Sequence, residues 1–146
     1  AFDGTTLYAI RLGSCKTVLL AEDGRDQVAG YHMAGDIIGT DGIASESHEC
    51  QAVALEDTEV CAIPFARVEE LSRASPQVLR NLHRMLATEI TRDRHVMLML
   101  GTMRADQRLA AFLLDLAQRY HARGYSSSEY VLRMTRETLA PVTGVR

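Results

Sequence analysis

The three cysteines, Cys15, Cys50 and Cys61, are the side chains of this sequence best suited to redox or metal chemistry. A thiolate binds soft metals and iron, and two thiols can form a disulfide. The cysteines are odd in number, and no two of them have the spacing of a metal finger or a CxxC motif. We therefore expect free thiols in a reducing compartment, the cytoplasm, rather than a disulfide framework.

The histidines are the other possible metal ligands. A metal enzyme built on a β-barrel needs two histidines close together on a strand, with a glutamate shortly after them. His32 is followed by MAGD, His48 lies in the polar stretch SESHEC, and His83 and His95 lie in a helical segment. We expect surface or packing histidines, so the sequence does not predict an enzyme.

A carboxylate interrupts the apolar repeat of the segment LHRMLATEITRDRHVMLML, residues 82–100. The repeat predicts a helix whose seam packs against a second helix, as in a coiled coil. Its seam positions are Leu79, His83, Leu86, Ile90, Asp93, Met97 and Leu100. Two copies of Asp93 about 6 Å apart across a two-fold axis would repel by about 3 kcal/mol at an effective dielectric of about 20, less whatever Arg92 and Arg94 neutralise. We predict that Asp93 weakens dimerisation; the alternative is a helix rotated so that Asp93 faces water.

Turn signals and periodicity divide the chain into a β part and a helical part. Residues 5–65 read as short strands separated by turns, including the Asp-Gly hairpin signal in EDGRDQ. With no helix between them, these strands predict an antiparallel β-roll, or jelly roll. A short helix in ARVEELSRA follows. Ser75 and Pro76 then supply the N-cap and first residue of a long helix that extends to about Gly101. The predicted fold class is α+β.

The C-terminal part reads as helical and basic. RADQRLAAFLLDLAQRYHARG predicts a second amphipathic helix that stops at Gly124, SSSEYVLRM predicts a short strand, and a further helix starts at Thr135. Pro141 departs from a good helical pattern. Residues 1–103 hold 9 Lys and Arg against 15 Asp and Glu, whereas residues 104–146 hold 7 Arg against 4 Asp and Glu. This asymmetry indicates a polyanion partner, and no apolar run reaches the roughly 18 residues of a membrane span.

Five stretches spread in order over nearly the whole chain resemble the cyclic-AMP-receptor/FNR superfamily of bacterial transcription regulators, and its FNR/Anr branch in particular. They are LYAIRLGSCKT, MAGDIIGTDGI, ALEDTEVCAIPF, LATEITRDRHVMLMLGTMRADQRLAAFLLDLAQRYHARG and LRMTRE. The resemblance implies a cyclic-nucleotide-binding-like β-roll sensor over residues 1–75, a dimerisation helix over 76–103, and the start of a winged helix-turn-helix domain over 104–146. It also implies a chain truncated at both ends, without the family's N-terminal cysteine cluster and its recognition helix.

The resemblance gives Cys61 a role. In the FNR branch, the cysteine of the matching strand is the fourth ligand of an oxygen-labile [4Fe–4S] cluster, and the other three ligands would lie upstream of this chain. Cys61 is thus the expected metal- and cofactor-binding residue. Cys15 and Cys50 match no ligand position. From the residues alone, Cys61 reads as a small buried strand residue.

The resemblance does not extend to the residues that hold a cyclic nucleotide. The ribose-binding glutamate of such relatives falls on Thr40, and their Arg-Ser pair falls near Cys50 and Gln51. No arginine or lysine lies between Arg25 and Arg67. Because a cyclic phosphate needs a guanidinium or a cluster of aimed amides, we expect no cyclic nucleotide.

The function implied by the resemblance is an oxygen- or redox-responsive transcription regulator in which the cluster controls formation of a homodimer that binds palindromic DNA. Thr135 and Arg136 begin the expected DNA-binding motif. The loops around Gly30 to Gly42 are the expected contact with RNA polymerase. One alternative is a regulator of the same fold that senses haem-bound nitric oxide or another signal. The other is a β-roll module that binds a small molecule.

Overall fold

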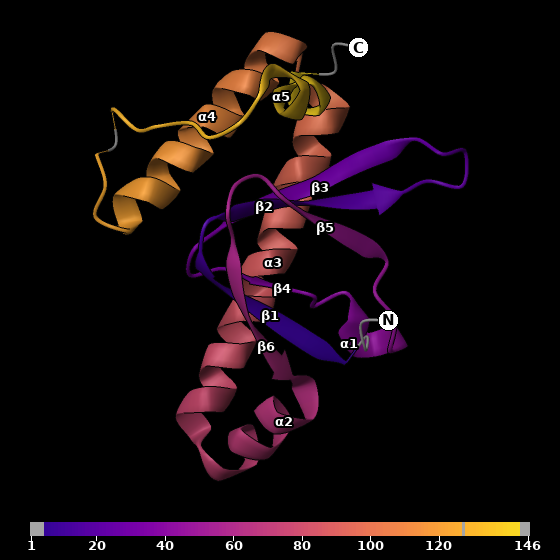
Figure 1. The fold of residues 1–146 in the computed structure, drawn as a ribbon, viewed down its shortest axis with the longest axis vertical. Helices are drawn as coiled ribbons and strands as arrows, with labels where there is room; N and C mark the ends of the chain where they lie inside the picture. Colours follow the sequence, from indigo (N-terminus) through magenta and orange to yellow (C-terminus); the bar gives the residue numbers. More distant parts are fainter. Residues whose placement is uncertain (1–4, 127, 144–146) are drawn as a thin grey trace. The chain divides into compact units, whose positions relative to one another are not determined.

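The computed structural model describes residues 5–126 and 128–143 (Figure 1). The chain forms two compact units, one running up to Arg94 and the other starting at His95. The division falls inside the long helix α3 (Pro76–Thr102). Among the described residues, none of the helices combines the length and the apolar character of a transmembrane span.

In the described part of the first unit, two antiparallel sheets of three strands each form the β-roll (Figure 1). One sheet has the order β4-β1-β6 and the other the order β3-β2-β5. The strands are β1 (Thr6–Leu12), β2 (Ser14–Leu20), β3 (Asp26–Met33), β4 (Ile37–Ile38), β5 (Cys50–Ala54) and β6 (Glu59–Pro64). Successive strands β1 and β2, and β5 and β6, belong to different sheets. This is the jelly-roll arrangement predicted from the short, closely spaced strands.

The turns of the roll use the residues that signal them in the sequence. In the β2–β3 hairpin, the amide of Ala21 donates to the carbonyl of Arg25 at 3.1 Å. Gly24 in this turn has φ +77°. Between β1 and β2, Gly13 has φ +89°, and a side chain there would collide with Asp57 and Thr58. Glycine is therefore required at this corner both for its conformation and for space.

The core of the roll is small and mostly apolar, and its buried residues do not follow strict alternation along the strands. Leu7 and Ile10 of β1 are buried, as are Cys15 and Val18 of β2. Tyr31, Met33 and Ile38 are buried as well.

Two of the three helices that begin in the described part of the first unit were predicted, whereas the short helix before β5 was not, because residues 5–65 were expected to form only strands and turns. A short α1 (Gly42–Ser45) precedes β5, and α2 (Phe65–Ala74) follows β6 directly. Helix α3 begins at Pro76, and the hydroxyl of Ser75 accepts a hydrogen bond from the amide of Val78 at 3.4 Å. The predicted N-cap and first residue are thereby confirmed.

The second unit contains α4 (Ala105–Ala122) and α5 (Arg136–Thr143). Gly124, at φ +87°, follows the end of α4 as predicted. The hydroxyl of Thr135 accepts the amide of Thr138 at 3.2 Å, which caps the predicted start of α5. Helix α5 continues through Pro141, whose ring removes one helical hydrogen bond in the second turn.

The short strand predicted in SSSEYVLRM is wrong for the described residues 128–135, which form neither strand nor helix. A strand needs a neighbour with which to exchange backbone hydrogen bonds. Here the segment is held instead by Tyr130, whose hydroxyl donates to the carbonyl of Leu113 in α4 at 2.8 Å. The Tyr130 ring also stacks on Tyr120, with 5.0 Å between ring centroids.

Candidate functional site

Within the first unit, helix α3 presents two parallel stripes of side chains, each with steps of three and four residues. The first stripe is half-buried, and we call it the roll-facing stripe. It consists of Val78, Leu82, Met85, Glu89 and Arg92. Steps of this size keep side chains on one face of a helix. This face packs toward the β3–β4 turn, as the contacts of Arg92 show.

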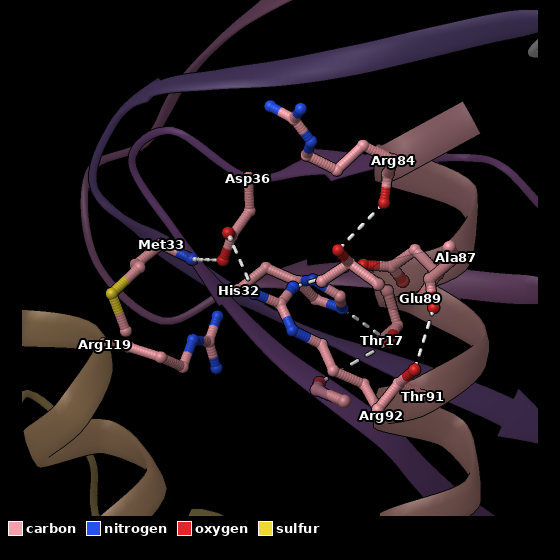
Figure 2. A network of polar contacts seen from close by, with 12 residues as sticks. Thr17, His32, Met33, Asp36, Arg84, Ala87, Glu89, Thr91, Arg92 and Arg119 are labelled. Atoms are coloured by element: carbon pink, nitrogen blue, oxygen red, sulfur yellow. Dashed lines mark hydrogen bonds and ion pairs between the residues drawn. The ribbon is translucent and has the colours of Figure 1, made fainter. Parts of the chain in front are cut away.

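An ionic network joins the roll-facing stripe to the β3–β4 turn (Figure 2). The guanidinium of Arg92 lies 3.7 Å from a carboxylate oxygen of Asp36 and 3.1 Å from a carboxylate oxygen of Glu89. The side chain of Asp36 is only 5% exposed, and its other oxygen accepts the amide of Met33 at 3.0 Å. Burial raises the pKa of Glu89, and nearby Asp93 and Asp36 add to this, although Arg92 opposes it. The network fixes the position of α3 on the roll at the residue before Asp93.

A shallow pocket of about 320 Å³ lies beside this network, between the β3–β4 turn and α3. Its lining is Gly35, Ile37, Asn81, Arg84, Met85, Thr88, Glu89 and Arg92. The guanidinium of Arg92 is already paired with two carboxylates. The pocket therefore presents opposite charges side by side rather than a clear anion or cation site.

The second stripe of α3 is the predicted dimer seam, and it is largely exposed in the single chain. Leu79 is 40% exposed and Ile90 is 52% exposed, and in the second unit the same helix exposes Met97 and Leu100. Leu86 is half-buried, whereas His83 and Asp93 are exposed. The helix thus brings the predicted seam residues to one face. That this face binds a second copy stays a prediction.

Cys61 lies on β6, opposite Ala9 of β1 in the sheet, and its side chain is exposed. Cys15 is buried in the core, where burial and the charge of Asp36 raise its pKa to about 11. Cys50 is half-buried, and burial, Asp41, Glu49 and Asp93 raise its pKa. The structure therefore corrects the reading of Cys61 as a buried strand residue, because Cys61 and its neighbours Val60 and Ala62 on β6 are all exposed.

An exposed thiol on a strand suits a cluster ligand, but one thiolate does not complete an iron–sulfur site. The described residues contain no group of three or more His, Cys, Asp or Glu side chains that could hold a metal ion. A cluster bound at Cys61 would therefore take its other ligands from outside the described residues.

The loop at the start of β5 is held by a carboxylate of the chain itself. Asp41 accepts the amide of Glu49 at 2.7 Å and the amide of Cys50 at 2.9 Å, and it lies 3.1 Å from Nδ1 of His48. Burial raises the pKa of Asp41, but the bonds from Cys50, His48 and Glu49 outweigh it and hold the pKa below its usual value. Cys50 is where the resemblance places the phosphate-binding pair of cyclic-nucleotide relatives, and there an internal carboxylate occupies the backbone donors.

The histidines of the roll are packing residues, as predicted. His32 is buried in β3, where its Nε2 lies 3.1 Å from the hydroxyl of Thr17. His48 is half-buried and paired with Asp41. Each has a structural contact within the roll, and they come from different segments.

In the second unit, Thr135 and Arg136 lie at the start of α5, at the N-cap and the first helical residue. Arg108 of α4 donates to the carbonyl of Val142 near the end of α5 at 3.1 Å, so α4 and α5 are joined by a side chain as well as by packing. The role of Thr135 and Arg136 in DNA binding stays a prediction.

Sequence reasoning missed the network of Asp36, Glu89 and Arg92 and the anchoring role of Asp41. The signal available in the sequence was weak. Glu89 and Arg92 share a face at an i, i+3 spacing, but their partner Asp36 is more than fifty residues away. No sequence signal indicated the role of Asp41, because the amides of Glu49 and Cys50 that donate to its carboxylate are brought close only by the fold of the loop.

The comparisons with known proteins agree with this architecture. Residues 3–75 match the cyclic nucleotide-binding domain family. The chain is 45% identical over 139 residues to the transcriptional regulatory protein Btr of Bordetella pertussis, covering 95% of this chain and 57% of the relative. It is 40% identical over 141 residues to an anaerobic regulatory protein of Aggregatibacter actinomycetemcomitans, covering 97% of this chain and 55% of the relative.

Among solved structures, FixK2 from Bradyrhizobium japonicum is similar with a TM-score of 0.81 and 28% identity, over 99% of this chain and 70% of that one. The chain spans little more than half the length of the curated relatives that it matches. These relatives are transcription regulators rather than enzymes. The chain belongs to the FNR/Anr branch of the cyclic-AMP-receptor/FNR superfamily of bacterial transcription regulators.

Proposed function

We propose that the chain acts as part of an oxygen- or redox-responsive, DNA-binding transcription regulator. The observation that carries the proposal is the exposed seam stripe of α3, in a chain 40% identical to an anaerobic regulatory protein. In this proposal, residues 1–75 form the sensor, residues 76–103 form the dimerisation helix, and residues 104–146 begin the DNA-binding domain.

The seam of α3 would pair with the same seam of a second copy. Its leucines, Ile90 and Met97 favour this pairing, because each buries apolar surface that the single chain leaves in water. Asp93 opposes it, since two like charges about 6 Å apart repel by about 3 kcal/mol at an effective dielectric of about 20. Opposing contributions of this kind keep the monomer–dimer equilibrium near its midpoint. Gain or loss of a cluster on the β-roll could then shift this equilibrium.

Light scattering across a concentration series tests the seam directly, with the chain and its Asp93→Ala variant. We expect the parent to be a monomer or weak dimer and the variant to pair at least about tenfold more tightly. Thr91→Ala is the control, because Thr91 lies on the same helix but outside the seam. Equal pairing of parent and Asp93→Ala would place the control of dimerisation elsewhere.

In the same proposal, Cys61 is one ligand of a [4Fe–4S] cluster, whose chemistry when bound is sensitivity to oxygen. The support is its exposed position on β6, which contrasts with the buried Cys15. The role of this chain is to present the thiolate on a rigid strand next to β1. The remaining ligands would come from sequence that precedes this chain.

A comparison of Cys61→Ser with Cys50→Ser tests the ligand, in the protein with its native flanking sequence and under anaerobic conditions. Iron and acid-labile sulfide, together with the visible absorbance, report the cluster. We expect Cys61→Ser to lose it and Cys50→Ser to keep it. Equal cluster content in Cys61→Ser and the parent would show that Cys61 is not a ligand.

The partners in this proposal are a palindromic DNA site, read by two copies of the C-terminal domain with Thr135 and Arg136 near its start, and RNA polymerase, contacted by the loops around Gly30 to Gly42. In this proposal the chain does not bind a cyclic nucleotide. The amides of Glu49 and Cys50, near the position of the phosphate-binding pair in cyclic-nucleotide relatives, already donate to the carboxylate of Asp41 and are not available to a phosphate.

A further inference from the structure

The two arginines that flank Asp93 have different surroundings. Arg92 belongs to the roll-facing stripe and is paired with Asp36 and Glu89. Arg94 is exposed, and among the described residues its guanidinium has no hydrogen bond or ion pair. Asp93 is exposed too and, within the described part of the chain, forms no ion pair. Of the two arginines, Arg94 is therefore the one available to another molecule.

The position of Arg94 relative to the seam is set by the seven-residue repeat. It follows Asp93 directly, which places it at the edge of the seam rather than inside it. In a parallel two-stranded coiled coil, the residue at this edge helps to form the hole that receives the seam side chain of the facing helix. Charged residues at such edge positions form ion pairs between the helices. The Asp93 side chain of the second copy therefore enters the hole that Arg94 helps to form. The residue at the opposite edge of the seam, Glu89, is already paired with Arg92 of its own chain.

We propose that in the homodimer Arg94 of each copy pairs with Asp93 of the other copy. The inference rests on the proposed function, because two DNA-binding units that read one palindrome require the helices to run parallel. The two-fold axis makes two such pairs. Asp93 then has two effects on the contact: it repels its own counterpart and attracts Arg94 of the facing helix.

This pairing also selects the arrangement of the two helices. A shift of the contact by one heptad would place Asp93 opposite Leu86 or Leu100 and leave Arg94 without a carboxylate. An antiparallel contact would also separate the two charges unless its two-fold axis passed close to Asp93. The pair therefore favours the parallel, in-register homodimer over other contacts of the same apolar stripe.

The chain offers a matched control in Arg80. It lies fourteen residues before Arg94, at the same position of the repeat, but its neighbour in the seam is Leu79 instead of a carboxylate. Its guanidinium donates to Gln77 of the same helix. An Arg80→Ala variant removes a cation from the same edge of the seam without removing a partner of Asp93.

The test is a double-mutant cycle on dimerisation, measured by light scattering or analytical ultracentrifugation with the chain as given, at concentrations that populate the weak dimer of the parent. A parent that stays monomeric at all concentrations while Asp93→Ala pairs would overturn the inference, because the two attractive pairs should hold part of the parent as a dimer. We expect Arg94→Ala to weaken the dimer by about fivefold or more, as loss of two exposed ion pairs allows. In the Asp93→Ala background, the same substitution should change the dissociation constant by less than about twofold. Arg80→Ala should have little effect in either background, and high salt should reduce the effect of Arg94→Ala.

Two further results would overturn the inference while leaving the seam intact: Arg94→Ala matching Arg80→Ala, or Arg94→Ala weakening the dimer equally with and without Asp93. A chain that stays monomeric at every concentration, even as Asp93→Ala, would overturn the proposed seam and the pairing with it. The behaviour of Asp93→Ala alone thus separates failure of the inference from failure of the proposed function.

Discussion

Arg92 of helix α3 lies 3.7 Å from the buried carboxylate of Asp36 in the β3–β4 turn, one residue before Asp93. This ion pair spans two segments more than fifty residues apart. It ties the roll-facing stripe of α3, next to Asp93, to the turn that precedes the Asp41 loop.

Loss of the Arg92 guanidinium should destabilise the first unit. Arg92→Met keeps the length of the side chain but removes the positive charge 3.7 Å from the Asp36 carboxylate, which is 5% exposed. We expect a loss of about 1–3 kcal/mol in the free energy of unfolding, less than for a fully buried pair because Arg92 itself is one-third exposed. Urea denaturation followed by circular dichroism measures it. Arg84→Met, on an exposed position of the same helix, is the control, and equal losses would contradict the role of the pair.

The Asp41 loop should make stability depend on acidic pH. The pKa of Asp41 is lower in the folded chain than its usual 3.8, so the unfolded chain binds more protons in this range. The contribution of Asp41 is therefore complete above pH 3.8 and is lost as the pH falls through the lowered pKa. We expect Asp41→Asn to cost about 1–2 kcal/mol near pH 7, with a smaller difference from the parent below pH 3.8.

Urea titrations at several pH values check this prediction, with Asp26→Asn, at the exposed first residue of β3, as the control. A difference between Asp41→Asn and the parent that stays constant down to pH 3 would show that the carboxylate charge is not what holds the loop.

Alanine substitutions at Gly13 and Gly24 should distinguish the cost of an unfavourable backbone conformation from the cost of a steric clash. Both have positive φ, at +89° and +77°, so alanine is strained at either position. At Gly24 a new Cβ meets nothing within 4 Å, whereas at Gly13 it would collide with Asp57 and Thr58. We expect Gly24→Ala to cost about 1 kcal/mol and Gly13→Ala about 1–3 kcal/mol more. Thermal unfolding of both variants measures the difference, and similar losses would mean that the β1–β2 corner can relax.

Much of the architecture was determined by the sequence, because its signals are local. The Asp-Gly turn, the Ser75–Pro76 start of α3 and the helical period of the following segment each act through neighbouring residues, and the predicted turn and helix were confirmed. That the repeat forms a dimer seam stays a prediction. The strand predicted in SSSEYVLRM was wrong for a complementary reason. A strand depends on a partner that local sequence does not specify, and Tyr130 bonds to α4 instead.

The tertiary structure decided the surroundings of each charge. In the sequence, Arg92 and Arg94 flank Asp93 alike, and both could neutralise it. Folding turns Arg92 toward the roll, where Asp36 pairs with it, and leaves Arg94 exposed. Cys15 and Cys61 differ in the same way, since one lies in the core and the other on an open strand. Residue type sets what a side chain can bind, but exposure and partners depend on segments that only folding brings together.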